Sequence, residues 1–171
     1  GWQRNEFLQE ESQREDDREV LEAAQQDLAA LNMTRAKSRL RPLLERNPGD
    51  TAVLQSWYNA CKVQKEDPDL HDAAGRILAL PGDTGEERAL VMDIFADYRQ
   101  RANPKLSASQ ATDLCCRLLR WEALEEGLLL LDRLMRLKKT PAELPRACLL
   151  AAQQLRRQGR SEEAKPYMEA V

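Results

Sequence analysis

The last stretch of the chain reads PRACLLAAQQLRRQGRSEEAKPYMEAV (residues 145–171), and it predicts two helices joined by a tight turn. Small and apolar residues recur three or four positions apart in its first part, which places them on one face of a helix. These residues are Cys148, Ala151, Ala152 and Leu155. Gly159 ends that helix, and Ser-Glu-Glu at 161–163 begins the next one, with acidic residues where the helix dipole favours them. Because the connection is short, we expect the two helices to pack antiparallel.

The composition predicts the same kind of structure for the whole chain. Its 171 residues include 27 Leu and 22 Ala but only 2 Ile, 5 Val and 5 Thr. Because β-branched residues are the usual strand formers, their scarcity argues against an all-β or α/β fold and indicates an all-α protein. A formal net charge of -3 argues against a general nucleic-acid-binding protein. No apolar run approaches the roughly 20 residues that span a bilayer.

Capping residues, prolines and glycines divide the sequence into about nine helices. The expected helices cover residues 5–31, 34–46, 51–65, 69–80, 83–101, 107–120, 122–138, 141–158 and 161–171. We expect Thr34 to cap the second helix, and Thr140 with Pro141 to begin the eighth. Every connection is short, so each helix should lie antiparallel to its neighbour in the sequence.

Pairs of small residues recur in this sequence at one spacing. The second member follows the first by twelve positions, and large residues stand four and seven positions beyond it. The pairs are Ala24/Ala36, Cys115/Gly127 and Ala152/Ala164, and the large residues that follow them are Leu40 and Leu43, Leu131 and Leu134, and Met168 and Val171. Small residues at this separation let two antiparallel helices approach closely, while the large residues pack against the next hairpin.

This pattern resembles the tetratricopeptide repeat, a helical hairpin of about 34 residues. The matching segments are residues 17–50, 51–80, 108–137 and 145–171. In the first segment, Ala24 and Ala36 match the small residues of the motif and Pro48 matches its closing proline. Asp27 departs from the motif, because the family usually has Tyr at that place.

The resemblance implies a domain organisation. Residues 17–171 would form an α-solenoid of tetratricopeptide-like antiparallel hairpins, preceded by a charged lead-in at residues 1–16 that could be juxtamembrane. The helix at 83–101 has no obvious partner and would be an additional helix that alters the curvature. A mixed helical bundle without true repeats is the alternative fold.

The resemblance also implies a function. In such a solenoid the first helix of each hairpin lines a concave face that binds peptides, so the chain would be a non-enzymatic protein–protein interaction scaffold. The candidate peptide-binding residues are Gln55, Trp57, Asn59 and Lys62. Trp57 and its neighbour Tyr58 diverge by about 100° on a helix, so at least one of them is expected in the core.

Motifs for catalysis or cofactor binding are not found in the sequence. The single histidine, His71, provides neither a catalytic triad nor a zinc site, and neither G-x-x-x-x-G-K-[ST] nor G-x-G-x-x-G occurs. We interpret the nearby Asp67, Asp69 and Asp72 as caps and helix-dipole partners rather than metal ligands. The four cysteines include no CxxC pair and are expected as free, buried thiols in a reducing compartment. We therefore expect no enzymatic activity, no metal and no cofactor in this chain.

Two further hypotheses concern the surroundings of the protein. The chain begins with Gly1 rather than Met, and Trp2 and Arg4 are residue types that favour the membrane interface and its cytoplasmic flank. The chain could therefore be the soluble, substrate-recruiting or self-associating domain of a larger bacterial membrane protein, such as a rhomboid-type intramembrane protease. A homodimer is the second hypothesis, because an uncapped solenoid exposes an apolar face. In each case we expect a cytoplasmic location, either free or tethered to the membrane.

Overall fold

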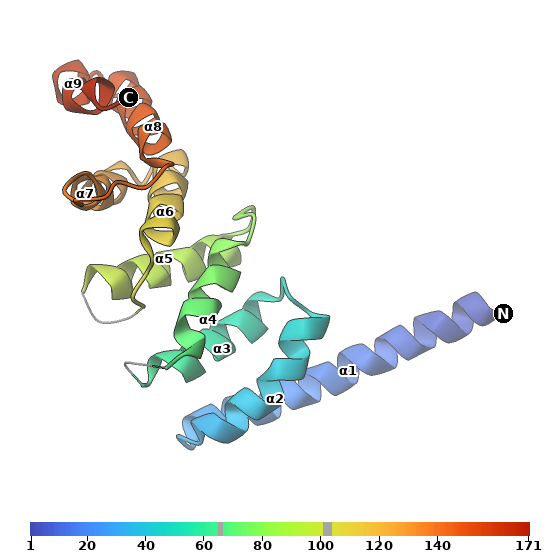
Figure 1. Cartoon of the computed structure of the whole chain (residues 1–171). Helices are drawn as coiled ribbons and strands as arrows, with labels where there is room; N and C mark the ends of the chain where they lie inside the picture. The colour runs from blue at the N-terminus through green and yellow to red at the C-terminus, as the bar shows by residue number, and fades with distance from the viewer. Residues whose placement is uncertain (65–66, 101–103) are drawn as a thin grey trace. The chain divides into compact units, whose positions relative to one another are not determined.

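The protein is entirely helical within the residues that the computed structural model describes, which are 1–64, 67–100 and 104–171 (Figure 1). These residues form nine helices and no strand, which confirms the all-α prediction. The helices are α1 (Trp2–Ala29), α2 (Met33–Arg46), α3 (Thr51–Lys62), α4 (Asp69–Leu78), α5 (Gly85–Arg99), α6 (Ala108–Arg120), α7 (Leu124–Met135), α8 (Leu144–Arg157) and α9 (Ser161–Glu169). They belong to two compact units, Gly1–Pro104 and Lys105–Val171.

The first unit contains α1 to α5. Each of these helices packs against the next one along the chain, and α3 also contacts α1 and α5. Side-chain caps fix where three of them begin. Asn32 accepts a hydrogen bond from the backbone N–H of Arg35 at the start of α2, Asp50 accepts two at the start of α3, and Thr84 forms a capping box with Glu87 at the start of α5.

Small residues and the ion pairs of Asp17 and Asp27 hold α1 against α2. Ala24 and Ala36, the first predicted small pair, are both fully buried on these two contacting helices. Asp17 of α1 accepts hydrogen bonds from Arg46 at 2.6 Å and from Asn47 at 2.9 Å. The hydrogen bond from Arg46 is the main cause that lowers the pKa of Asp17 to about 2. Asp17 is therefore a carboxylate at neutral pH and ties α1 to the C-terminal end of α2.

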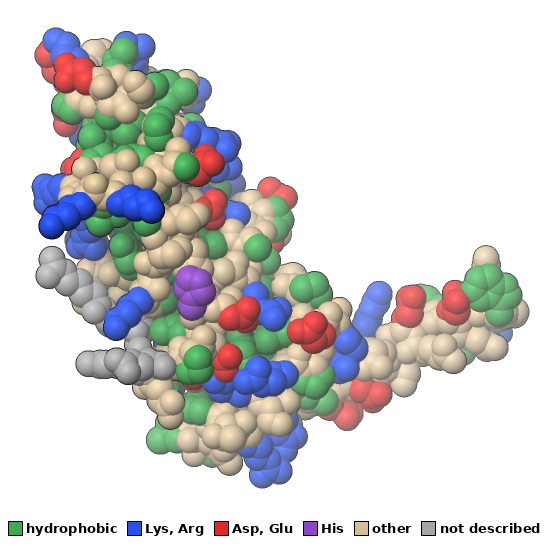
Figure 2. All heavy atoms as spheres, in the orientation of Figure 1, with side chains coloured by type: hydrophobic (Ala, Val, Ile, Leu, Met, Phe, Trp, Pro, Cys, Tyr) green, Lys and Arg blue, Asp and Glu red, His purple; other side chains and the backbone are tan. Residues whose placement is uncertain are grey.

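The expected lead-in, residues 1–16, forms the first half of α1, and all of its residues are exposed. At its N-terminal end α1 extends beyond the other helices of the first unit (Figure 1). Apolar side chains gather at this end among acidic and basic ones (Figure 2). The large exposed apolar residues there are Trp2, Phe7 and Leu8. None of the described helices combines the length and the apolar character that crossing a membrane requires.

The second unit contains α6 to α9, with α6 packed on α7, α8 packed on both, and α9 packed on α8. α6 and α7 approach each other closely at Gly127, where the Cys115 thiol donates a hydrogen bond to the Gly127 carbonyl oxygen at 3.3 Å. A Cβ atom at position 127 would lie only 2.7 Å from Cδ2 of Leu119. The predicted pair Cys115/Gly127 is therefore in contact. Ala152 and Ala164 are buried on the contacting helices α8 and α9.

Two predicted helix starts are wrong. Thr34 lies inside α2, because Asn32 provides the cap one residue before the helix begins. Thr140 and Pro141 lie outside α8, which begins at Leu144. The backbone N–H of Leu144 donates to the carbonyl oxygen of Pro141 at 3.1 Å, so these residues form a separate turn before the helix.

All four cysteines are buried and free, as the sequence predicts. Burial raises the pKa of each thiol, and it raises the pKa of Cys61 to about 12. A thiol needs its thiolate form to react, so these cysteines act as packing residues at neutral pH.

Candidate functional site

The four candidate binding residues all lie on α3, but they do not share one surface. Gln55 and Lys62 are exposed, and Asn59 between them is partly buried. These three residues follow one another at intervals of four and three positions, which places them on the same side of a helix. Trp57 is only 2% exposed and points to a different side, where it contacts side chains of α2. Its neighbour Tyr58 is also buried, so both aromatic residues lie in the core.

The side of α3 that carries Gln55 faces α5 across an open depression of about 310 Å³. The depression is lined by Thr51, Ala52, Gln55, Glu86, Ala89, Leu90 and Asp93. Its charged members are the two acidic residues of α5. Within the described part of the chain, neither Glu86 nor Asp93 has an ion-pair or hydrogen-bond partner. The depression therefore carries uncompensated negative charge beside a polar amide.

The other end of the α3–α5 contact is held by a buried tyrosine. The Tyr58 hydroxyl donates to Asp97 Oδ2 at 2.7 Å, and the Lys62 ammonium lies 3.5 Å from the same oxygen. Burial, followed by the hydrogen bond to Asp97, raises the pKa of Tyr58 well above its usual value. The negative charge of Asp97 is therefore compensated by Lys62 of α3, whereas the charges of Glu86 and Asp93 are not compensated by any described residue. Lys62 contributes to this contact and also lies over the Tyr58 ring.

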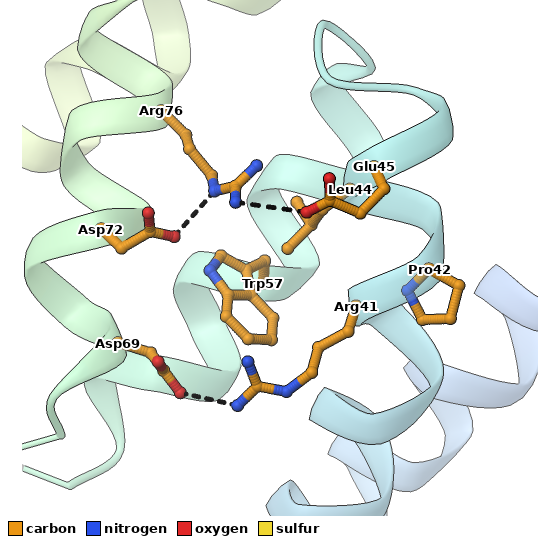
Figure 3. A pocket seen from close by; sticks show the side chains of 8 residues that line it. All are labelled: Arg41, Pro42, Leu44, Glu45, Trp57, Asp69, Asp72 and Arg76. Atoms are coloured by element: carbon orange, nitrogen blue, oxygen red, sulfur yellow. Dashed lines mark hydrogen bonds and ion pairs between the residues drawn. The ribbon is translucent and has the colours of Figure 1, made fainter.

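On the other side, Trp57 forms part of a cleft of about 480 Å³ between α2, α3 and α4 (Figure 3). The cleft is lined by Arg41, Pro42, Leu44, Glu45, Trp57, Asp69, Asp72 and Arg76. The Arg41 guanidinium lies 5.1 Å and the Lys37 ammonium 5.5 Å from the centre of the indole ring. Both distances are within the range of cation–π attraction.

Ion pairs surround the opening of this cleft. Asp69 binds two cations of α2, the Lys37 ammonium at 2.6 Å and the Arg41 guanidinium at 3.0 Å. The hydrogen bond from Lys37 is the main cause that lowers the pKa of Asp69. On the opposite side of the opening, Arg76 Nε binds Asp72 at 2.7 Å and a second nitrogen of Arg76 lies 3.8 Å from Glu45. The cleft is therefore rimmed by charges of both signs.

The acidic residues near His71 take part in structural contacts. Asp69 and Asp72 lie in the first turn of α4, as expected for helix-dipole partners, but the N-cap residue of this helix makes no side-chain cap hydrogen bond, and Asp67 and Asp69 both pair with Lys37 of α2. The Asp67 carboxylate accepts a hydrogen bond from the backbone N–H of Asp69 at 2.8 Å, and Asp72 pairs with Arg76 one helical turn later. Among the residues that the structure describes, no three His, Cys, Asp or Glu side chains are arranged to hold a metal ion.

The Trp57 indole N–H is buried and has no hydrogen-bond partner. Two other buried side-chain atoms of the described residues share this property, but they belong to Asp27 and Arg39, which lie 2.8 Å apart as an ion pair. The indole nitrogen has no such compensation. Figure 3 shows the nitrogen edge of the indole turned toward Asp72 and Arg76, and its six-membered ring toward Arg41.

Several residues of these two surfaces were not selected from the sequence. Glu86 and Asp93 are seven positions apart, a spacing that places them on one side of α5, so their periodicity could have been recognised. The partners around Trp57 carried no such signal, because Arg41 and Asp69 are 28 positions apart and meet only when α2 and α4 pack on α3. No family model, curated protein or solved structure matches the chain.

Proposed function

We propose that this chain is a non-enzymatic protein-binding domain built from tetratricopeptide-like hairpins, and that the depression between α3 and α5 binds a protein segment containing Lys or Arg. The hairpin repeat would be an α-solenoid, with the first helix of each hairpin on the concave face. Binding would combine hydrogen bonds from Gln55 with attraction between the acidic residues of α5 and the cations of the segment.

The packing order of the helices supports the repeat. Within the first unit, α1, α3 and α5 contact in succession, and α2 and α4 each pack on the helices before and after them. Within the second unit, α6 contacts α8 in the same way. Neighbouring hairpins of a helical-repeat protein pack through such contacts between elements two positions apart. The buried small residues at the α1–α2, α6–α7 and α8–α9 contacts agree with this arrangement.

One observation carries the binding proposal: Glu86 and Asp93 lie unpaired in the same depression as Gln55. Elsewhere on the first unit, acidic residues of the interior contacts are paired, as Asp17 is with Arg46 and Asp97 is with Lys62. Two carboxylates that lack a partner within the chain favour a cationic partner from outside it. Attraction of this kind is weakened by salt, which gives the interaction a measurable signature.

An array of immobilised nonapeptides with equal shares of basic, neutral and acidic sequences provides the test, with the purified chain as the probe. We expect the bound peptides to be enriched in Lys and Arg. The affinity of the strongest binder is then measured by fluorescence anisotropy for the wild type and for the double variant Glu86→Gln/Asp93→Asn. Two exposed charge pairs predict a loss of about fivefold in affinity.

The double variant Glu162→Gln/Glu169→Gln is the matched control, because it removes the same charge from exposed positions of α9. It should bind the basic peptide as the wild type does. Equal affinity of the wild type and the α5 double variant, or an array without preference for basic sequences, would contradict the proposed site.

A further inference from the structure

The Trp57 cleft offers a hydrogen-bond donor that the chain itself does not use. The indole N–H can donate but not accept, and burying such a donor without a partner costs free energy. Trp57 is almost completely buried, and its nitrogen edge faces the Asp72–Arg76 side of the cleft (Figure 3). An acceptor that enters from this side would satisfy the donor.

The ion pair on this side of the cleft can be displaced. Asp72 and Arg76 are neighbours on consecutive turns of α4, and their side chains are 52% and 32% exposed. Ion pairs with this much exposure contribute little to stability, because water competes for both partners. A ligand that offers each of the two groups a new hydrogen bond can therefore separate them at low cost.

The charges of the cleft select the kind of ligand. A carboxylate that reaches the indole N–H would be attracted by Arg76 but would lie close to the two carboxylates that already pair with it, Asp72 and Glu45. An ammonium would lie beside the guanidinium of Arg76 and would leave the indole unsatisfied. A carboxamide avoids both problems. Its oxygen can accept from Trp57 and Arg76, and its NH₂ group can donate to Asp72.

We infer that the cleft between α2, α3 and α4 binds an uncharged carboxamide, the side chain of Gln or Asn in a peptide, through the Trp57 indole N–H and the separated Asp72–Arg76 pair. This site lies on a different side of α3 from Gln55, so it does not depend on the proposed function of the α3–α5 depression.

Nuclear magnetic resonance tests this site directly, since each tryptophan gives one indole N–H signal. The chain has three tryptophans, and the variant Trp57→Phe assigns the signal of interest by its disappearance. The probes are three blocked tripeptides, acetyl-Ala-X-Ala-N-methylamide, whose ends carry no primary carboxamide and in which X is Gln, Glu or Met. Met has a similar length but presents no carboxamide, and Glu replaces the carboxamide by a carboxylate.

We expect the Gln peptide to shift the Trp57 indole signal in a saturable way, and the Glu and Met peptides to bind about tenfold more weakly. The comparison among peptides uses the wild type, so it remains decisive if Trp57→Phe folds poorly. Equal shifts from all three peptides, or no shift from the Gln peptide, would overturn the inference. The variant Glu86→Gln/Asp93→Asn should keep the selectivity for the Gln peptide, which distinguishes this site from the proposed binding site between α3 and α5.

Discussion

Replacing Gly127 by Ala tests the close approach of α6 and α7. Ala adds one methyl group, whose carbon would lie 2.7 Å from Cδ2 and 2.9 Å from Cγ of Leu119. The Leu119 side chain is fully buried, so it has no open space into which to move. Overpacking of a tight core costs about 1–3 kcal/mol, while Ala in place of Gly inside a helix gains about 1 kcal/mol. Because both contacts are shorter than 3 Å and Leu119 is buried, the upper part of this range applies, about 2–3 kcal/mol, and we expect a net loss of about 1–2 kcal/mol in the free energy of unfolding.

Urea denaturation followed by circular dichroism measures this loss. Gly85→Ala is the matched control, because nothing lies within 4 Å of a Cβ atom at that position, and it should leave stability unchanged or slightly higher. The double variant Gly127→Ala/Leu119→Ala identifies the cause. Once the Leu119 side chain has been removed, the added methyl should stabilise the protein by about 1 kcal/mol instead. A Gly127→Ala variant as stable as the wild type would refute the close contact.

Three further predictions concern pH, a buried hydroxyl and the thiols. Asp17→Asn should lower the free energy of unfolding by about 1 kcal/mol at neutral pH. The lowered pKa of Asp17 would imply a larger loss, but solvent exposure of the Asp17–Arg46 pair reduces it. The control Asp16→Asn should leave the free energy of unfolding unchanged. Since the folded-state pKa of Asp17 is about 2, the cost of Asp17→Asn should shrink in urea titrations as the pH falls below about 4 and should vanish only below about pH 2. Tyr58→Phe should lower the unfolding free energy by about 1–2 kcal/mol through the loss of its bond to Asp97, and an unchanged urea midpoint would count against that bond. The four cysteines should react with a thiol reagent only in denaturant, whereas rapid labelling of the native protein would contradict their burial.

Much of the fold could be predicted from local sequence patterns. The number of helices follows from composition and capping residues, and the Cys115/Gly127 contact follows from the spacing of small residues. These features depend on residues that are close in the sequence, where helix geometry fixes which side chains meet. The Thr140–Pro141 start was wrong because a cap followed by proline is also a common beginning for a turn. Local patterns did not distinguish these two outcomes.

The candidate site was predicted only in part. Gln55, Asn59 and Lys62 share a side of α3, as their spacing implies. Trp57 was grouped with them, but it is buried beneath Arg41 on another side of the helix. An aromatic residue on an amphipathic helix can serve the core or a binding surface, and the choice depends on which helices pack around it. That packing depends on how α2 and α4 lie against α3, and no short sequence motif predicts this arrangement.

The central claim is that the two helices of a hairpin pack through close contacts between small residues. Nuclear Overhauser spectra of the protein with labelled alanine methyl groups measure this most directly. We expect cross-peaks between the methyl groups of Ala24 and Ala36 and between those of Ala152 and Ala164. Their absence from a folded sample whose alanine signals are assigned would contradict the hairpin arrangement.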